Sequence, residues 1–261
     1  MPTVTSKDGT TIAYSKAGNG PALILVDGAL CSRNFGPMPG YAAKLADQYT
    51  VYWYDRRGRG ESGDTLPFTI EKEVDDLAAI LDAAGGSAFV MGTSSGGAIT
   101  LQAAVRGLGI RKMILYEAPY VPVGKDGRTA SDHAAALSRL IGQGDRGGAV
   151  TYFMSDAVGM PKFIAFFFRF FPMWPKLKAV AHTLPYDLTI MSDTAILDGG
   201  ARGVKIPALV AGGAKSPASL KAAVERVHAA IPGSELRWLE GQTHNLGAEP
   251  AAEMAKTFFG R

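Results

Sequence analysis

Short apolar runs alternate with segments of helical periodicity over most of the chain, and this alternation limits the possible folds more than any other feature. A short continuous apolar run is typical of a strand that is covered on both faces. The expected strands are residues 22–26, 50–54, 88–91, 113–116, 208–211 and 235–239, and the expected helices are 41–47, 70–84, 96–106, 217–230 and 249–259. Because parallel strands must be joined by crossover segments, the pattern predicts an α/β fold with a mostly parallel sheet and helices on both faces.

Two segments depart from this alternation. Residues 3–5 and 11–15 flank the turn sequence Lys7-Asp8-Gly9, which predicts an antiparallel hairpin at the start of the sheet. From 119 to 200 the chain has no buried-strand run and reads as helical or irregular. We therefore expect one domain with a core formed by 1–118 and 201–261. Residues 119–200 would be a helical lid inserted after the sixth of eight strands.

The composition argues against several functional classes. The 27 basic and 24 acidic residues leave a net charge of +3, and no basic run is longer than a pair, so neither nucleic acid nor a membrane is an expected partner. The lone Cys31 excludes a disulfide framework and a structural zinc cluster, and it favours a cytoplasmic location. Residues 1–10 do not resemble a secretory signal, and the apolar stretch 163–174 is interrupted by Arg169 well short of the roughly 20 residues of a membrane span.

One motif indicates a chemical function. Gly92-Thr93-Ser94-Ser95-Gly96-Gly97 follows the apolar run 88–91 and opens the expected helix 96–106. On such a strand-to-helix turn the central serine is held over the sheet edge in a strained conformation, and the flanking glycines leave room for the turn. The helix N-terminus supplies N–H groups and partial positive charge for a developing oxyanion. We therefore interpret Ser94 as a nucleophile rather than as part of a helix cap.

Two further motifs follow the expected strands 22–26 and 50–54. They are Leu25-Val26-Asp27-Gly28-Ala29 and Tyr54-Asp55-Arg56-Arg57-Gly58-Arg59-Gly60-Glu61-Ser62. With the serine turn, they resemble the serine-nucleophile branch of the α/β-hydrolase superfamily, in which the second motif reads D-x-R-G-x-G-x-S and the first usually contains His-Gly. The resemblance covers nearly the whole chain and implies an eight-stranded α/β-hydrolase sheet with a helical lid. Because the superfamily acts on esters, lactones, amides, epoxides and haloalkanes, the fold alone does not determine the reaction.

The resemblance implies a serine nucleophile with a histidine base. Relatives that open epoxides or displace halide carry an aspartate at the turn, whereas Ser94 suits attack on an acyl carbon. A serine hydroxyl needs a base within hydrogen-bond reach, and the family places this base in the loop after the last strand. Of the four histidines, only His244 in Gly241-Gln242-Thr243-His244-Asn245 has this position. We predict that His244 is the base.

The third member of the triad departs from the usual pattern. Most relatives carry an aspartate after the seventh strand, where this chain has Ser216, and a serine cannot stabilise an imidazolium as a carboxylate does. Glu117 follows the sixth strand, a position at which some relatives carry their acid. Because parallel strands present their carboxyl ends to the site, Glu117 is the predicted acid. Asp193 and Asp198 are the alternative acids, and a site without any acid is the third alternative.

Two backbone donors would complete the site. The resemblance implies an oxyanion hole formed by the N–H groups of Ala29 and Ser95. Asp27 places a carboxylate beside this hole, where relatives carry histidine. A free negative charge there would oppose catalysis, so we expect Asp27 to be turned away or paired with Arg56 or Arg57.

The expected substrate pocket combines the loop after the third strand with the aromatic part of the insertion. Its predicted lining is Leu30, Cys31, Phe167, Phe171 and Trp174. An apolar pocket of this kind fits a small to medium acyl substrate. No cofactor or metal is expected. The only dinucleotide-like match, at 58–63, is not followed directly by a helix, and no metal-ligand spacing occurs.

The predicted function is hydrolysis of a small to medium apolar carboxylic ester, lactone or related acyl compound through an acyl-enzyme. The stretch 54–58 also resembles the cofactor-free perhydrolase (haloperoxidase) branch, in which peroxide replaces water. A non-catalytic ligand-binding protein on the hydrolase fold is the second alternative.

Overall fold

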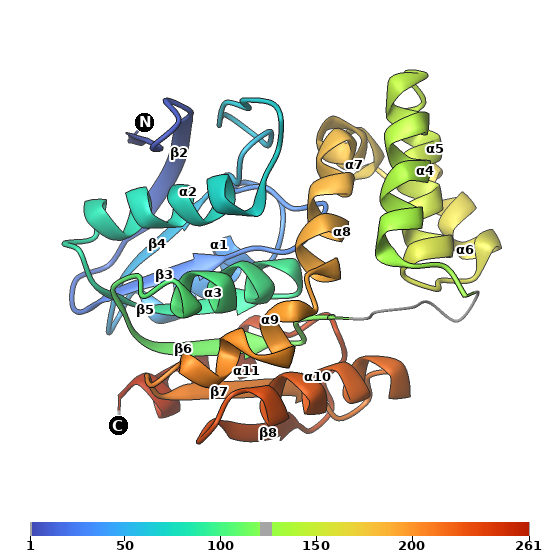
Figure 1. Cartoon of the computed structure of the whole chain (residues 1–261). Coiled ribbons are helices and arrows are strands. Elements are labelled where there is room, and N and C mark those ends of the chain that lie inside the picture. Colours follow the sequence, from blue (N-terminus) through green and yellow to red (C-terminus); the bar gives the residue numbers. More distant parts are fainter. Residues whose placement is uncertain (1, 121–126, 261) are drawn as a thin grey trace.

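An eight-stranded sheet forms the centre of the computed structural model, which describes residues 2–120 and 127–260 (Figure 1). The strands are β1 (Thr3–Thr5), β2 (Thr11–Ala17), β3 (Ala22–Val26), β4 (Thr50–Tyr54), β5 (Ala88–Thr93), β6 (Ile110–Tyr116), β7 (Ala208–Gly213) and β8 (Glu235–Leu239). Their order is β1-β2-β4-β3-β5-β6-β7-β8, with β1 and β2 antiparallel to their neighbours and the other pairs parallel. The predicted sheet and its antiparallel start are confirmed.

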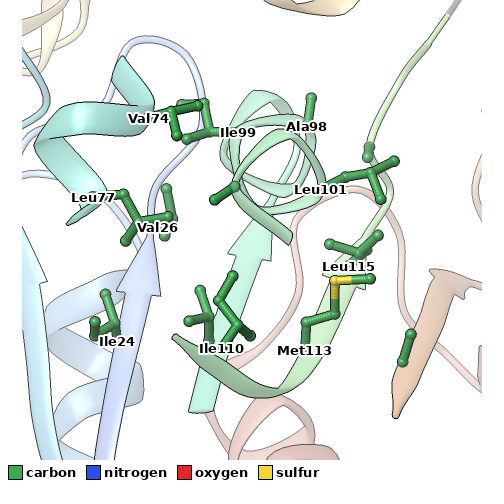
Figure 2. Packing of buried hydrophobic residues seen from close by; sticks show 14 of the residues in the cluster. Ile24, Val26, Val74, Leu77, Ala98, Ile99, Leu101, Ile110, Met113 and Leu115 are labelled. Atoms are coloured by element: carbon green, nitrogen blue, oxygen red, sulfur yellow. The ribbon is translucent and has the colours of Figure 1, made fainter. Parts of the chain in front are cut away.

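Helices cover both faces of the sheet. Side chains from α2, α3 and α10 pack on one face, and side chains from α1 and α11 pack on the other. These helices are α1 (Met38–Leu45), α2 (Ile70–Ala83), α3 (Ser95–Val105), α10 (Ala218–Ala230) and α11 (Ala248–Phe259). Figure 2 shows the first face, with Val74 and Leu77 of α2 on the side of β3 and Leu101 of α3 on the side of β6. The small side chains of α3 let this helix lie close to the sheet, and its first nine residues are buried.

Helix α1 begins three residues earlier than predicted. Its first turn contains Pro39, and the first turn of a helix is where proline is tolerated, because the N–H that it lacks would have no partner there. Strand β5 in turn extends two residues beyond the predicted end, through Thr93, so that the strand leads directly into the serine turn.

Between β6 and β7 the described chain forms a helical insertion. Its elements are α4 (Ala130–Gly142), α5 (Arg146–Tyr152), α6 (Lys162–Phe167), α7 (Trp174–Val180), α8 (Leu184–Ser192) and α9 (Ala195–Asp198), together with a π-helical turn (Phe153–Ala157) and 3₁₀ turns (Phe168–Phe170, Ala181–Thr183 and Gly200–Gly203). Helix α8 contacts α2 and α3 of the core as well as α4, and α4 to α6 lie on its far side (Figure 1). The predicted lid 119–200 also includes residues 121–126, which lie outside the described residues. Within the described ranges, no helix combines the length and the apolar character needed to cross a bilayer.

Candidate active site

Ser94 lies between β5 and α3 in a strained backbone conformation, with φ 53° and ψ −129°. Its N–H donates to the Tyr116 carbonyl at the end of the neighbouring strand β6, at 2.9 Å. Gly96 makes the turn possible, because a Cβ at this position would lie 2.3 Å from the carbonyl oxygen of Val26 and 2.6 Å from that of Asp27. The N-terminus of α3 therefore packs directly against the end of β3.

Backbone strain is concentrated at this edge of the sheet. Among the described residues, only Leu30, Ser94 and Glu117 combine a side chain with a positive φ, at 62°, 53° and 46°. Such conformations cost on the order of 1–3 kcal/mol each and persist only where the surroundings determine them. All three are predicted site residues, so the strain indicates a functional site at this edge.

Glu117 and His244 form a hydrogen-bonded pair. His244 Nδ1 lies 2.8 Å from Glu117 Oε2, and the N–H of Gly213 donates to Glu117 Oε1 at 2.7 Å. The Ser216 hydroxyl lies beside this carboxylate but makes no hydrogen bond of good geometry. Burial alone would raise the pKa of Glu117, yet these neighbours outweigh burial and hold the pKa below its ordinary value. Glu117 is therefore ionised at neutral pH and can stabilise an imidazolium.

Tyr116 connects the loop that carries His244 to Ser94. Its carbonyl accepts the N–H of Ser94, and its hydroxyl donates to the carbonyl of Thr243, the residue before His244. The imidazole side chain is 42% exposed. Within the described ranges, neither Ser94 Oγ nor His244 Nε2 hydrogen bonds to a protein atom. Catalytic contacts in ligand-free enzymes are often long and tighten when substrate binds.

The two alternative acids lie elsewhere. Asp193 accepts a hydrogen bond from Gln102 Nε2 at 2.6 Å, and Asp198 lies 3.6 Å from Arg226 in an ion pair. In the part of the chain that the structure describes, neither carboxylate contacts His244. Of the predicted acids, the structure brings Glu117 to the histidine.

The predicted oxyanion donors lie on two sides of Ser94. Ser95 is the first residue of α3, and Ala29 belongs to the loop of residues 27–31 after β3, which we call the oxyanion loop. This loop packs against Ser94, because a Cβ on Gly28 would lie 2.9 Å from Ser94 Cβ. Within the described ranges, the N–H groups of Ala29 and Ser95 donate to no protein acceptor. Their role as oxyanion donors stays a prediction.

The expected pairing of Asp27 with Arg56 or Arg57 is wrong. Both guanidinium groups are occupied by other carboxylates, two of which come from α2. Arg56 pairs with Glu73 and Asp187, and Arg57 pairs with Asp76 and Asp8. The negative charge of Asp27 must therefore be handled in another way.

Burial instead favours the protonated, uncharged form of Asp27. Its side chain is 5% exposed, its Oδ1 accepts the N–H of Gly28 at 2.9 Å, and its Oδ2 makes no hydrogen bond of good geometry. Burial raises the pKa of Asp27 to about 7, although the Gly28 amide, the nearby Cys31 thiol and two guanidinium groups act in the opposite direction. At neutral pH much of this carboxyl therefore carries a proton beside the oxyanion loop.

Replacing Asp27 by asparagine is expected to extend activity to higher pH. Ionisation of Asp27 through a pKa of about 7 adds a negative charge beside the predicted oxyanion hole, and we expect kcat/KM to fall by roughly tenfold above that pH. The profile of kcat/KM between about pH 5 and 9 should fall on its alkaline side in the wild type but not in Asp27→Asn.

The same substitution should alter the pH dependence of stability. The folded pKa of Asp27 is raised above the ordinary 3.8, so its contribution to stability is full below about pH 4 and is lost as the pH rises through about 7. Thermal unfolding should therefore show a loss of stability over this window in the wild type that is smaller in Asp27→Asn. If kcat/KM falls equally at alkaline pH in the wild type and in Asp27→Asn, ionisation of Asp27 is not the cause of the fall.

The predicted pocket residues are dispersed. Leu30 packs into the hydrophobic core of the insertion, and burial raises the pKa of the Cys31 thiol, which lies beside Asp27. Phe167 and Phe171 lie on the insertion with 57% and 53% of their surface exposed. Trp174 lines an open groove of about 890 Å³ that is formed by residues of the insertion rather than by the candidate triad. A pocket lined by these residues over Ser94 stays a prediction.

The sequence pattern of the alpha/beta hydrolase family matches residues 23–257 of this chain. The chain belongs to the alpha/beta hydrolase family. An alpha/beta hydrolase from Sphaerobacter thermophilus DSM 20745, known from its crystal structure, shares 42% sequence identity with this chain. The two structures have a TM-score of 0.89, and the match covers 99% of this chain and 100% of that chain. The enol-lactonase from Burkholderia xenovorans LB400 shares the fold at 23% identity, with a TM-score of 0.74 and 100% of each chain covered.

A curated relative of this alpha/beta hydrolase matches over a shorter stretch. It is an uncharacterized hydrolase, YraK, of Bacillus subtilis (strain 168), which is 33% identical over 102 residues. The matched part spans 38% of this chain and 37% of the length of the relative.

One buried acid of this alpha/beta hydrolase contacts the candidate site but is not among the residues predicted from the sequence. Asp187 of α8 is 0% exposed, and its carboxylate accepts a hydrogen bond from the Ser95 hydroxyl at 2.6 Å. The signal that could have revealed it is a single acid among apolar residues in the segment Leu184–Ser192. An acid in such surroundings is rarely buried unless it is paired.

Proposed function

We propose that this alpha/beta hydrolase is a serine hydrolase that cleaves small to medium apolar carboxylic esters or lactones through an acyl-enzyme. The observation that carries the proposal is the strained Ser94 at the start of α3, one strand away from the hydrogen-bonded Glu117–His244 pair. The enol-lactonase that shares this fold, and an esterase from Exiguobacterium antarcticum that also shares it, indicate that the fold accommodates acyl hydrolysis.

In the proposed reaction, Ser94 Oγ attacks the acyl carbon while His244 Nε2 accepts its proton. Glu117 stabilises the imidazolium that results, and the N–H groups of Ala29 and Ser95 stabilise the oxyanion. His244 then gives the proton to the departing alcohol. Water, activated by the same histidine, hydrolyses the acyl-enzyme and regenerates Ser94.

A series of p-nitrophenyl esters with increasing acyl length tests the proposal, together with an aliphatic lactone. We expect turnover of the short and medium esters by the wild type and none above background by Ser94→Ala. Added hydrogen peroxide tests the perhydrolase alternative, which predicts that a peracid forms from the acyl donor. Tight binding of an apolar ester without any turnover would overturn the proposal and favour a ligand-binding protein.

A further inference from the structure

A buried ionic network connects the helical insertion to the core beneath Ser94. Asp187 Oδ2 accepts from Arg59 Nη2 at 2.7 Å, and Asp187 Oδ1 accepts from Arg56 Nη1 at 2.8 Å and from Ser95 Oγ at 2.6 Å. Arg56 also pairs with Glu73 at 2.8 Å. Two guanidinium groups thus balance two carboxylates, and charges can be buried only when they are compensated in this way.

The two arginines bind the backbone of the oxyanion loop. Arg59 Nη1 donates to the carbonyl of Gly28 at 2.6 Å, and Arg56 Nη1 donates to the carbonyl of Asp27 at 3.3 Å. The Gly28 carbonyl and the Ala29 N–H belong to one planar trans peptide, so they point in opposite directions. By holding this carbonyl, Arg59 sets the direction in which the Ala29 N–H points.

The other end of the network holds the second predicted donor. The Ser95 hydroxyl donates to Asp187 and accepts a hydrogen bond from Arg56 Nη1 at 3.0 Å. Ser95 is the first residue of α3, and its side chain is completely buried. The carboxylate of Asp187 therefore contacts groups that position both sides of the predicted oxyanion hole.

We propose that Asp187 is a positioning residue that holds the oxyanion hole in its catalytic geometry without touching the substrate. This inference rests on the proposed function. Asp187 acts through Arg59 on the Gly28–Ala29 peptide and through the Ser95 hydroxyl on the start of α3. Arg59 Nε also donates to Thr183 Oγ1 at 3.1 Å, so a second residue of the insertion anchors the same guanidinium. The oxyanion hole therefore forms fully only when α8 is docked on the core.

The decisive variant is Asp187→Asn, which keeps the shape of the side chain but removes its charge. We expect kcat for the best p-nitrophenyl ester to fall about 100-fold while KM changes less than about threefold, because a misplaced oxyanion donor weakens transition-state binding. A trifluoromethyl ketone with the same acyl chain, which forms a tetrahedral adduct, should bind more weakly by a similar factor. The unreactive amide of the same chain should bind as before.

Asp76→Asn is the matched control. Asp76 and Arg57 form an equally buried pair at 2.7 Å, and neither contacts the oxyanion loop or Ser95 within the described ranges. This variant should lower the thermal stability but keep kcat within about threefold of the wild type. Equal losses of kcat in Asp187→Asn and Asp76→Asn would overturn the inference, since both would then reflect general loosening of the fold.

Ser95→Ala removes the hydrogen bond between Ser95 and Asp187 but leaves the buried charges of Asp187 and the two arginines paired. This variant tests the inference if Asp187→Asn does not fold. We expect kcat to fall roughly tenfold in Ser95→Ala. The double variant should lose no more kcat than Asp187→Asn alone, because both changes break the same connection. If Ser94→Ala is inactive but kcat is unchanged in Ser95→Ala or in folded Asp187→Asn, the inference is overturned and the proposed function stands. Absence of turnover in the wild type would instead overturn the proposed function, and this inference with it.

Discussion

Replacing Ser94 by alanine is expected to lower kcat/KM for esters on the order of 10⁶-fold and to leave the fold intact. The hydroxyl is the proposed nucleophile, and the adjacent Ser95 hydroxyl is buried against Asp187 and cannot replace it. Because Ser94 Oγ makes no hydrogen bond to protein within the described ranges, its loss should change the free energy of unfolding by less than about 0.5 kcal/mol. Steady-state kinetics and thermal unfolding measure the two effects separately.

A fluorophosphonate probe identifies the nucleophile directly. Peptide mass spectrometry should place the label on Ser94 in the wild type and in Ser95→Ala, and it should find none in Ser94→Ala. Ser95→Ala is the control because Ser95 is the adjacent serine. Its hydroxyl is buried against Asp187, so we expect the probe not to react with it. His244→Ala should also abolish labelling, since the proposed base that activates Ser94 is then lost. Labelling of Ser94→Ala at the wild-type rate would contradict the mechanism.

Glu117→Gln is expected to lower kcat about 10⁴-fold. Glutamine has nearly the same size and can still accept the N–H of Gly213. It carries no charge to stabilise the imidazolium, however, and its NH₂ group favours the wrong tautomer of His244 when it faces Nδ1. Steady-state kinetics on the folded variant measure the loss. A change of less than about tenfold would exclude Glu117 as the acid of the triad.

A second substitution in the Glu117→Gln protein tests whether the acid can be moved. Ser216 stands where the family resemblance implies an aspartate, and its hydroxyl lies beside Glu117. Ser216→Asp is therefore expected to restore at least about tenfold of the lost kcat. The same change in the wild type places two carboxylates together, which raises the pKa of one of them and should lower activity. Failure to restore kcat would show that position 216 cannot support His244.

The sheet and the serine turn could be predicted because both leave local signals. Buried parallel strands are continuous apolar runs, and the turn around Ser94 requires glycines at fixed spacing. The choice of Glu117 combined the position of one carboxylate at a strand end with the resemblance to relatives that carry their acid there. These features depend on neighbours in the sequence or on the regular order of an α/β sheet, so one chain is sufficient to recognise them.

The ionic network could not be predicted, because its partners are far apart in the sequence. Asp187 is 131 residues from Arg56 and 128 from Arg59, and nothing local distinguishes these arginines from solvated charges in a turn. The error over Asp27 has the same origin. Arg56 and Arg57 are instead paired by Glu73 and Asp76 of α2, and nothing local in the sequence shows which acid pairs with which arginine.

The docking of α8 has a consequence for how activity would arise during synthesis. Ser94 leaves the ribosome long before Asp187 and His244, and the earlier part of a chain generally begins to fold first. A nascent chain that exposes Ser94 would still lack the proposed base His244 and the buried carboxylate of Asp187, which we propose to complete the oxyanion hole. In the proposed mechanism, catalytic competence would therefore appear only as the last third of the protein is put in place.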